Sequence, residues 1–151
     1  LAKEKKVPEV RSAELAAYFT NCNLAGKHMK FVLKSAIIAC WNIHNFLQAA
    51  YFARRLLELQ PGKGMKSLAD KVIRAVAAQA DKRVNEHKLD FDERNPFTVC
   101  GYSLVPIYKG QECVHCPYCN TSYLSEHKGK TCNVCEIAQV GKQTKGLRIK
   151  K

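Results

Sequence analysis

Two Cys-x-x-Cys pairs near the end of the chain restrict its fold more than any other feature. Cys116-Pro-Tyr-Cys119 and Cys132-Asn-Val-Cys135 are separated by twelve residues. A module of about 50 residues buries too little apolar surface to be stable alone, and a structural metal ion is one remedy. Zinc prefers four ligands in a tetrahedron, and each Cys-x-x-Cys turn brings two sulfurs to the same ion. The sequence therefore predicts one structural zinc ion (Zn²⁺) per chain, held by Cys116, Cys119, Cys132 and Cys135.

The sequence also allows other sets of metal ligands. Cys113 forms a further in-register pair with Cys116, and His115 and His127 are spare imidazoles, so one of them could replace a cysteine ligand. A chain without any metal is the remaining alternative. Asn120 follows the second sulfur of the first pair, where a left-handed backbone is often needed and asparagine tolerates it.

Catalytic roles for these cysteines are disfavoured. A thioredoxin-type redox motif requires a βαβ context, which is missing, and a cysteine hydrolase requires a positioned histidine with an orienting partner. Four closed sulfur ligands also leave no open position for metal catalysis. Six of the eight cysteines crowd into the last 52 residues, unlike the spread of a secreted disulfide scaffold. We therefore expect a reducing compartment and no enzymatic activity.

Residues 12–88 have apolar residues at helical spacing and predict a helical bundle or a short solenoid. Ser12 is expected to cap the first helix, and Pro61-Gly62 to end another. Three apolar stripes carry the prediction: Leu33, Ala36, Ile37 and Cys40; Phe46, Ala49, Ala50, Ala53, Leu56 and Leu57; and Met65, Leu68, Ala69, Val72, Ile73, Val76, Ala77 and Ala80.

The pattern changes at Asn95-Pro96, which breaks the helical periodicity. The predicted fold is α+β, with a helical stem (1–94) followed by a zinc-ribbon-like β module (95–151), docked as one unit. A hairpin is predicted over residues 103–114, with a turn at Lys109-Gly110, and further strands over 121–124 and 135–141. The hairpin offers four apolar anchors for a partner, or else these side chains form the module's own core: Leu104, Val105, Ile107 and Tyr108.

The net charge of +12 fits nucleic acid, anionic lipid or an acidic protein as a partner, and does not choose among them. The alternative function is therefore a nucleic-acid-binding zinc ribbon on a basic helical domain. Past residue 95, however, Arg148 is the only arginine and no aromatic residues interleave with basic ones, so no specific nucleic acid is expected. A zinc-binding ubiquitin-ligase module is a weaker possibility, because four cysteines are too few for two ions.

No signal peptide or membrane-spanning apolar run is present in the sequence. The chain begins at Leu1 without a methionine, and we expect it to be a piece of a longer protein.

The string "DERNPFTVCGYSLVPIYKGQECVHCPYC", followed by "GKTCNVCEIAQVGKQTKGL", resembles the C-terminal domain of the alpha subunit of coatomer. The shared features are the Asn-Pro-Phe at 95–97, Cys100, the Pro-Ile-Tyr at 106–108, the Cys-Pro pair at 116–117 and the late Gly146-Leu147. The resemblance is strongest from Asp90 onward, and the upstream helices are compatible with it.

The resemblance implies a structural part of the COPI vesicle coat, which supports Golgi-to-ER retrograde and intra-Golgi transport. In this family the C-terminal domain binds the epsilon subunit, a tetratricopeptide-like protein that clamps a protruding β-hairpin. Other coatomer subunits bind through the rest of the full-length chain. The implied location is the cytoplasm, on the cytosolic face of Golgi membranes and COPI-coated vesicles, with peripheral membrane association only as part of the coat.

Overall fold

The computed structural model describes residues 8–78 and 87–144 of the chain. Two compact units follow each other in the sequence, and they divide between Phe91 and Asp92. The first unit is helical and the second contains short antiparallel strands, so the fold is α+β as predicted. The expected docking of the two units as one body stays a prediction. No helix within the described ranges is both long enough and apolar enough to span a membrane.

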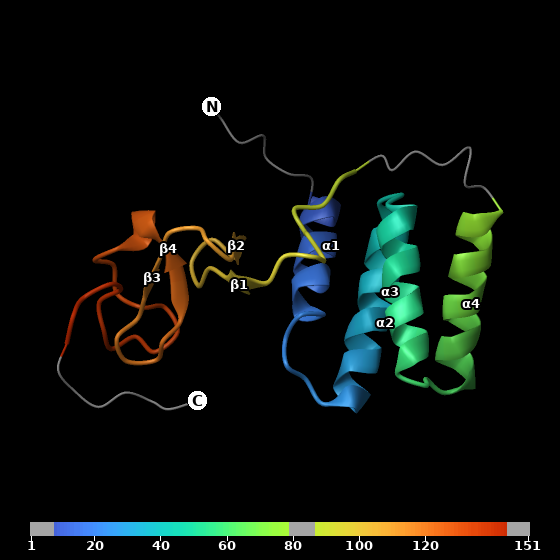
Figure 1. The fold of residues 1–151 in the computed structure, drawn as a ribbon, viewed down its shortest axis with the longest axis horizontal. Coiled ribbons are helices and arrows are strands. Elements are labelled where there is room, and N and C mark those ends of the chain that lie inside the picture. Colours follow the sequence, from blue (N-terminus) through green and yellow to red (C-terminus); the bar gives the residue numbers. More distant parts are fainter. Residues whose placement is uncertain (1–7, 79–86, 145–151) are drawn as a thin grey trace. The chain divides into compact units, whose positions relative to one another are not determined.

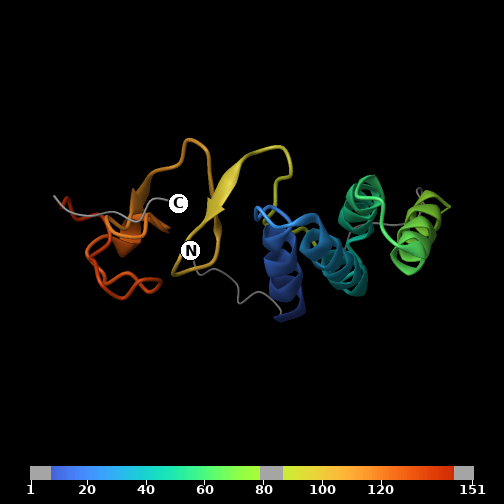
Figure 2. The same ribbon diagram turned by 90° about the horizontal axis from the view of Figure 1, so that it is seen from below.

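Four helices stand side by side in sequence order, as Figures 1 and 2 show: α1 (Pro8–Phe19), α2 (Gly26–Asn42), α3 (Phe46–Glu58) and α4 (Lys63–Ala77). Each helix makes its extensive contacts with the next one along the chain. The short connections turn the chain back on itself, which makes consecutive helices antiparallel. The helical unit is therefore a row of helices, in keeping with the short solenoid among the predicted alternatives.

The core of the row is built from the predicted stripes of α2 and α3. The α2 stripe, represented by Leu33 and Ile37, is buried, and alanines such as Ala49 and Ala53 let α3 approach its neighbours closely. The prediction omitted Phe52, although it lies three residues after Ala49 on the same helical face. Phe52 is fully buried and is one of the largest side chains in this core.

One helical prediction needs correction, and one predicted stripe is less buried than the others. Ser12 does not cap the first helix, because α1 already begins at Pro8, a residue that suits the first helical turn, and Glu9 follows where the helix dipole favours a negative charge. The long stripe on α4 is only partly buried: of its described members, Ala69 and Val72 are buried. Helix α4 is the last of the row, so its extensive contacts are with α3 alone. Ala80 lies outside the described residues.

Residues 87–91 pack against the helical unit, and we call them the return segment. Its backbone is bonded to α1 at Asp90. The Asp90 N–H donates to Glu14 Oε1 at 3.1 Å, and the Tyr18 hydroxyl donates to the Asp90 carbonyl at 2.9 Å. The Glu14 carboxylate is fully buried and also accepts a 3.0 Å bond from Arg11. These bonds fix the return segment to α1.

The return segment also contributes to the helical core. Asn45 donates from Nδ2 to the His87 carbonyl at 2.9 Å, while its Oδ1 caps the start of α3. Leu89 is buried in the same cluster as the helix side chains. The ring of Phe91 lies 5.6 Å from that of Phe52. The last residues of the first unit, which directly precede the second unit in the sequence, therefore complete the core of the helices.

The described part of the second unit, residues 92–144, holds two pairs of antiparallel strands. Strand β1 (Phe97–Val99) pairs with β2 (Pro106–Tyr108), and β3 (Cys113–His115) pairs with β4 (Ser122–Leu124), which leads into the 3-10 turn η1 (Ser125–His127). The predicted strand at 121–124 is therefore present, and Pro106 opens a strand of a two-stranded sheet, where proline is tolerated.

The predicted hairpin over residues 103–114 is wrong. Its two halves belong to different sheets, because β2 pairs backward with β1 and β3 pairs forward with β4. The turn between β1 and β2 is closed by the Leu104 N–H, which donates to the Cys100 carbonyl at 3.0 Å, and Leu104 adopts a left-handed φ of 52°. Leucine rarely adopts this conformation, so the sequence gives little sign of the turn. The predicted turn at Lys109-Gly110 is present, with Gly110 at φ 97°, but it joins the two hairpins.

The strand predicted over residues 135–141 is also wrong. This segment contributes one isolated bridge, between Thr131 and Gln139. Glu136 and Gly141 have left-handed φ values of 58° and 73°, which interrupt an extended backbone on both sides of the bridge.

Candidate metal centre and docking hairpin

The four cysteines of the two pairs lie together. Their sulfur atoms all lie within 4.8 Å of one another. Cys116 Sγ is 3.6 Å from Cys135 Sγ, and Cys119 Sγ is 3.5 Å from Cys132 Sγ. A tetrahedral ion with metal–sulfur bonds of about 2.3 Å places its sulfurs about 3.8 Å apart, so the cluster has the size that such an ion requires. These four residues could therefore hold a metal ion.

Both pairs form the same backbone turn, which we call a knuckle. In the first knuckle the Asn120 N–H donates to the Cys116 carbonyl at 3.0 Å, and the Cys119 N–H points to Cys116 Sγ at 3.5 Å. In the second, the Glu136 N–H donates to the Cys132 carbonyl at 2.9 Å. The residue after each second cysteine is left-handed, with φ 62° at Asn120 and 58° at Glu136. The sequence predicted this conformation at Asn120 and missed it at Glu136.

Each knuckle sits at the end of a paired segment. The first follows β3 and is closed by the Cys116 N–H, which donates to the Thr121 carbonyl at 3.0 Å, just before β4. The second is closed by the Cys132 N–H, which donates to the Ala138 carbonyl at 2.8 Å. Backbone hydrogen bonds therefore fix both turns. Within each turn, the two cysteines are three residues apart in the sequence.

Tyr123 of β4 supports the cluster from inside the module. Its side chain is fully buried, and its hydroxyl lies 3.0 Å from Cys132 Sγ and 2.7 Å from Asn133 Oδ1. Asn133 in turn donates from Nδ2 to the Gly101 carbonyl at 2.6 Å. This chain of bonds connects the second knuckle to the β1–β2 turn. Sequence reasoning did not single out Tyr123 or Asn133.

The thiols of the cluster differ in acidity. Burial raises the pKa of Cys116 to about 11. Burial also opposes ionisation of Cys132, but the Tyr123 hydroxyl and the backbone N–H groups of Cys135 and Val134 lower its pKa to about 6. At neutral pH Cys132 is therefore available as a thiolate, whereas a metal ion must displace the proton of Cys116.

Gly101 lies directly against Tyr123. A Cβ atom at this position would be 2.6 Å from Tyr123 Cε1 and 2.9 Å from its hydroxyl oxygen, distances at which neighbouring atoms have to move. The position therefore needs glycine because the backbone approaches a buried aromatic ring closely. Nothing in the local sequence signals this requirement.

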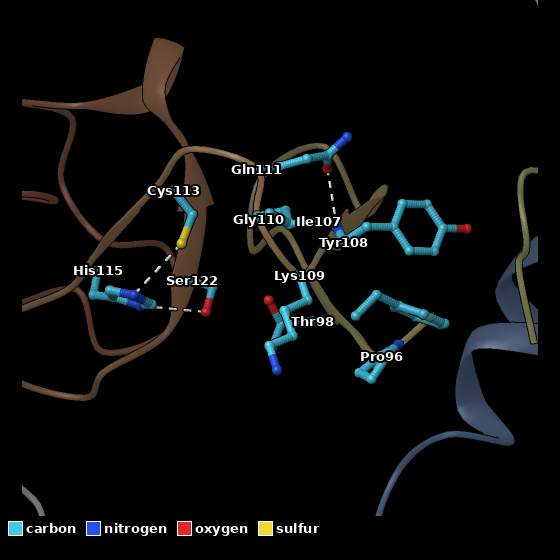
Figure 3. A pocket seen from close by; sticks show the side chains of 11 residues that line it. Pro96, Thr98, Ile107, Tyr108, Lys109, Gly110, Gln111, Cys113, His115 and Ser122 are labelled. Carbon is cyan, nitrogen blue, oxygen red and sulfur yellow. Dashed lines mark hydrogen bonds between the residues drawn. The ribbon is translucent and has the colours of Figure 1, made fainter. Parts of the chain in front are cut away.

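The alternative ligands lie outside the sulfur cluster. Cys113 Sγ is 3.6 Å from His115 Nε2, and His115 Nδ1 is 3.3 Å from Ser122 Oγ, beside a cavity of about 280 Å³ (Figure 3). The His127 ring packs 5.0 Å from the ring of Tyr102. Within the described ranges, the four paired cysteines form the one group of three or more ligands that could hold a metal ion.

The four predicted docking residues have unequal environments. Leu104 is 44% exposed, whereas Ile107 is 3% exposed and belongs to the module's core, as the alternative prediction held. Val105 is partly buried against the same core. Tyr108, visible beside the cavity in Figure 3, stacks edge-on against Phe97 at 5.5 Å, and its hydroxyl accepts a bond from the Asp92 N–H. Leu104 is therefore the side chain of the four most accessible to a partner.

Comparison with known proteins gives one consistent result. Residues 2–151 match the family model for the C-terminus of the coatomer (COPI) alpha subunit. The chain is 46% identical over 139 residues to coatomer subunit alpha of Dictyostelium discoideum, covering 92% of the chain. It is 43% identical over 145 residues to coatomer subunit alpha-1 of Arabidopsis thaliana, covering 96%. It is 31% identical over 141 residues to coatomer subunit alpha of Saccharomyces cerevisiae, covering 93%. The matched region spans 11% of the Dictyostelium protein and 12% of the other two.

Proposed function

The chain belongs to the family formed by the C-terminal domains of coatomer alpha subunits, and from this premise we propose that it binds the epsilon subunit as a structural, non-enzymatic part of the COPI coat. The family match over residues 2–151 is the observation that carries this proposal. In it, the rest of the full-length chain connects the domain to the other coatomer subunits. The assembly works on the cytosolic face of Golgi membranes and COPI-coated vesicles, in Golgi-to-ER and intra-Golgi transport.

The β1–β2 hairpin, residues 97–108, is the element that we propose the epsilon subunit grips. Its turn carries Leu104, whose apolar side chain is accessible and whose backbone is left-handed. The Asn133–Gly101 bond ties the base of this turn to the knuckles. A hairpin that is already ordered loses little conformational entropy on binding. Burying an exposed leucine side chain against a partner contributes about 1.5–3 kcal/mol through the apolar surface removed from water.

Replacing Leu104 with asparagine is expected to weaken epsilon binding by about 2 kcal/mol, roughly 30-fold in Kd, because it removes the apolar surface that the partner would bury. Asparagine accepts the left-handed backbone at this position, so the hairpin is retained. Calorimetric titration of the whole chain with the epsilon subunit of its own organism measures the change.

Ile137→Asn is the matched control, since it removes another exposed apolar side chain of the same module. It should leave the affinity unchanged. Equal affinities for the unmutated chain and a folded Leu104→Asn variant would place the docking surface elsewhere. If the unmutated chain shows no binding at all, the proposed function itself fails.

We also propose that the ion held by the knuckles is zinc. Soft thiolate ligands in a tetrahedral set favour zinc, and four cysteines close the coordination sphere, so the ion is structural. The residues of the two knuckles and Tyr123 have different roles in holding the zinc ion. The four sulfurs supply the ligands, Tyr123 orients Cys132, and the left-handed Asn120 and Glu136 close the turns.

Metal-replete protein is expected to contain one zinc ion per chain by native mass spectrometry. Binding should release protons, because the ligands must be thiolates and Cys116 is protonated at neutral pH. The pKa of Cys132 is about 6, so this group is mostly a thiolate at pH 7 and mostly a thiol at pH 5. Proton release should therefore rise by about one per zinc as the pH falls from 7 to 5, and affinity should fall with acidification.

Zinc titrations in two buffers of different ionisation enthalpy count the released protons. Proton release that is independent of pH would contradict the assigned acidities. The zinc proposal itself would be abandoned if elemental analysis of metal-replete protein found no zinc, or if these cysteines formed disulfides under reducing conditions.

A further inference from the structure

The helical unit carries an apolar groove that the hairpin hypothesis does not use. A cavity of about 450 Å³ lies between α1 and α2. Two large aromatic side chains stand at one end of it, Phe19 at 58% exposed and Phe31 at 61% exposed. Leu15 and Ala16 of α1 and Val32 of α2 also line it. Exposed phenylalanines gathered around a hollow are uncommon on a free protein surface and mark binding sites.

The groove continues along the two helices. A second cavity of about 330 Å³ shares Ser12 and Ser35 with the first and extends to Ile38 and Asn42. From Phe31 to Asn42 the groove follows twelve residues of α2, whose eleven helical steps correspond to about 16 Å, or three helical turns. This is the length of a short amphipathic helix, which binds by laying an apolar stripe into such a groove.

Charge at the groove selects the partner. Helix α2 contains three lysines and a histidine and no acidic residue. Lys27 and Lys34 are exposed, and they lie four residues before and three residues after Phe31, on the same helical face. Of the described residues, Glu9, at the far end, is the one acidic side chain that lines either cavity. We propose that the α1–α2 groove binds an acidic amphipathic helix of another protein, with carboxylates beside Lys27 and Lys34.

Two other occupants fit the groove less well. A second copy of the chain related by a two-fold axis would bring the Lys27 and Lys34 sides of two α2 helices together, and like charges repel. An anionic membrane would attract the lysines, but its surface cannot fill a hollow between two helices, whereas a helical apolar stripe can. A protein helix uses both the hollow and the charge.

A designed helical peptide tests this inference on the whole chain. The fluorescein-labelled probe has about sixteen residues, with leucines at i, i+3, i+4 and i+7 and glutamates beside them. A second peptide keeps the leucines and has lysine in place of glutamate. Fluorescence anisotropy should show binding of the acidic peptide at least about ten-fold tighter than that of the basic one.

Variants then locate the site. Phe31→Ala and Lys34→Glu are each expected to weaken binding of the acidic peptide by about ten-fold. Their matched controls are Leu47→Ala, an exposed apolar residue of α3, and Lys66→Glu, an exposed lysine of α4, and both should bind normally. Circular dichroism and melting temperature confirm that each variant is folded.

Three results would overturn the inference. The first is that the chain binds the acidic and the basic peptide with equal affinity, or that the unmutated chain and both groove variants bind the acidic peptide with equal affinity. The second is a self-associated chain, seen by sedimentation, that Phe31→Ala dissociates. The third is binding to phosphatidylserine vesicles that depends on Phe31 while peptide binding does not.

Discussion

Cys132→Ser is expected to unfold the β module while the four helices stay folded. A structural metal contributes about 10–16 kcal/mol in small zinc modules, and this is folding free energy that the module cannot replace from a core of its size. Removing Cys132 takes away one of the four ligands and the group that lies 3.0 Å from the buried Tyr123 hydroxyl. The loss therefore reaches both the metal centre and the module's core.

Three measurements separate the two units. Limited proteolysis should cut the variant within residues 92–144, and zinc should be absent from the purified protein. The helical circular dichroism signal should persist. The single tryptophan, Trp41, belongs to α2 and packs edge-on against Phe46, so its fluorescence should be unchanged. Metal removal from the unmutated chain by a chelator should give the same pattern.

Cys113→Ser is the matched control for Cys132→Ser. Cys113 is exposed and lies outside the sulfur cluster, so the variant should keep both zinc and protease resistance. If the Cys132→Ser module resists protease as well as this control does, the module's own core is sufficient and the metal has little structural role.

Gly101→Ala is expected to destabilise the β module by about 3 kcal/mol. The added methyl group would overlap the ring of Tyr123, which is fully buried and hydrogen-bonded at its hydroxyl end. Overpacking of this kind costs about 1–3 kcal/mol, and each hydrogen bond lost when the ring shifts costs about 1 kcal/mol more. Chemical denaturation of the zinc-loaded chain, followed by tyrosine absorbance, measures the change.

Gly64→Ala controls for the loss of a glycine. Gly64 lies in the first turn of α4 with no atom near the position of a Cβ, so alanine should be neutral or stabilise the helix by up to about 1 kcal/mol. Equal stabilities of the two variants would show that the Tyr123 ring moves without cost.

The proximity of the four paired cysteines could be predicted because each knuckle is encoded within four residues, and the spacing alone brings two sulfurs together. The contacts that support the cysteine cluster could not be predicted. The contact of Tyr123 with Cys132 depends on how β4 packs beneath the second knuckle, and the need for glycine at 101 arises from a residue distant in the sequence, Tyr123. Tertiary contacts of this kind leave no periodic trace in the sequence.

The helices were predicted from the periodicity of their apolar residues. The predicted apolar stripe is also the buried face where a helix has neighbours on both sides, as at Leu33 and Ala53. Strand pairing was harder. The segment 103–114 contains two short strands around a glycine turn, which reads as one hairpin, but the left-handed Leu104 turns the first of them back onto residues 97–99. A three-residue strand is too short for its pattern to decide between two partners.

The return segment determines how the chain transmits tension. A pull applied between Pro8 and Asp92 acts on α1 at one end and on the residue after the return segment at the other. These two parts are joined directly, where Asp90 is bonded to Glu14 and Tyr18. Helices α2 to α4 form an excursion between two points that are already fastened together, so they lie outside the path of the force. Tension along the chain would first break the bonds of Asp90, and only then peel the helices apart.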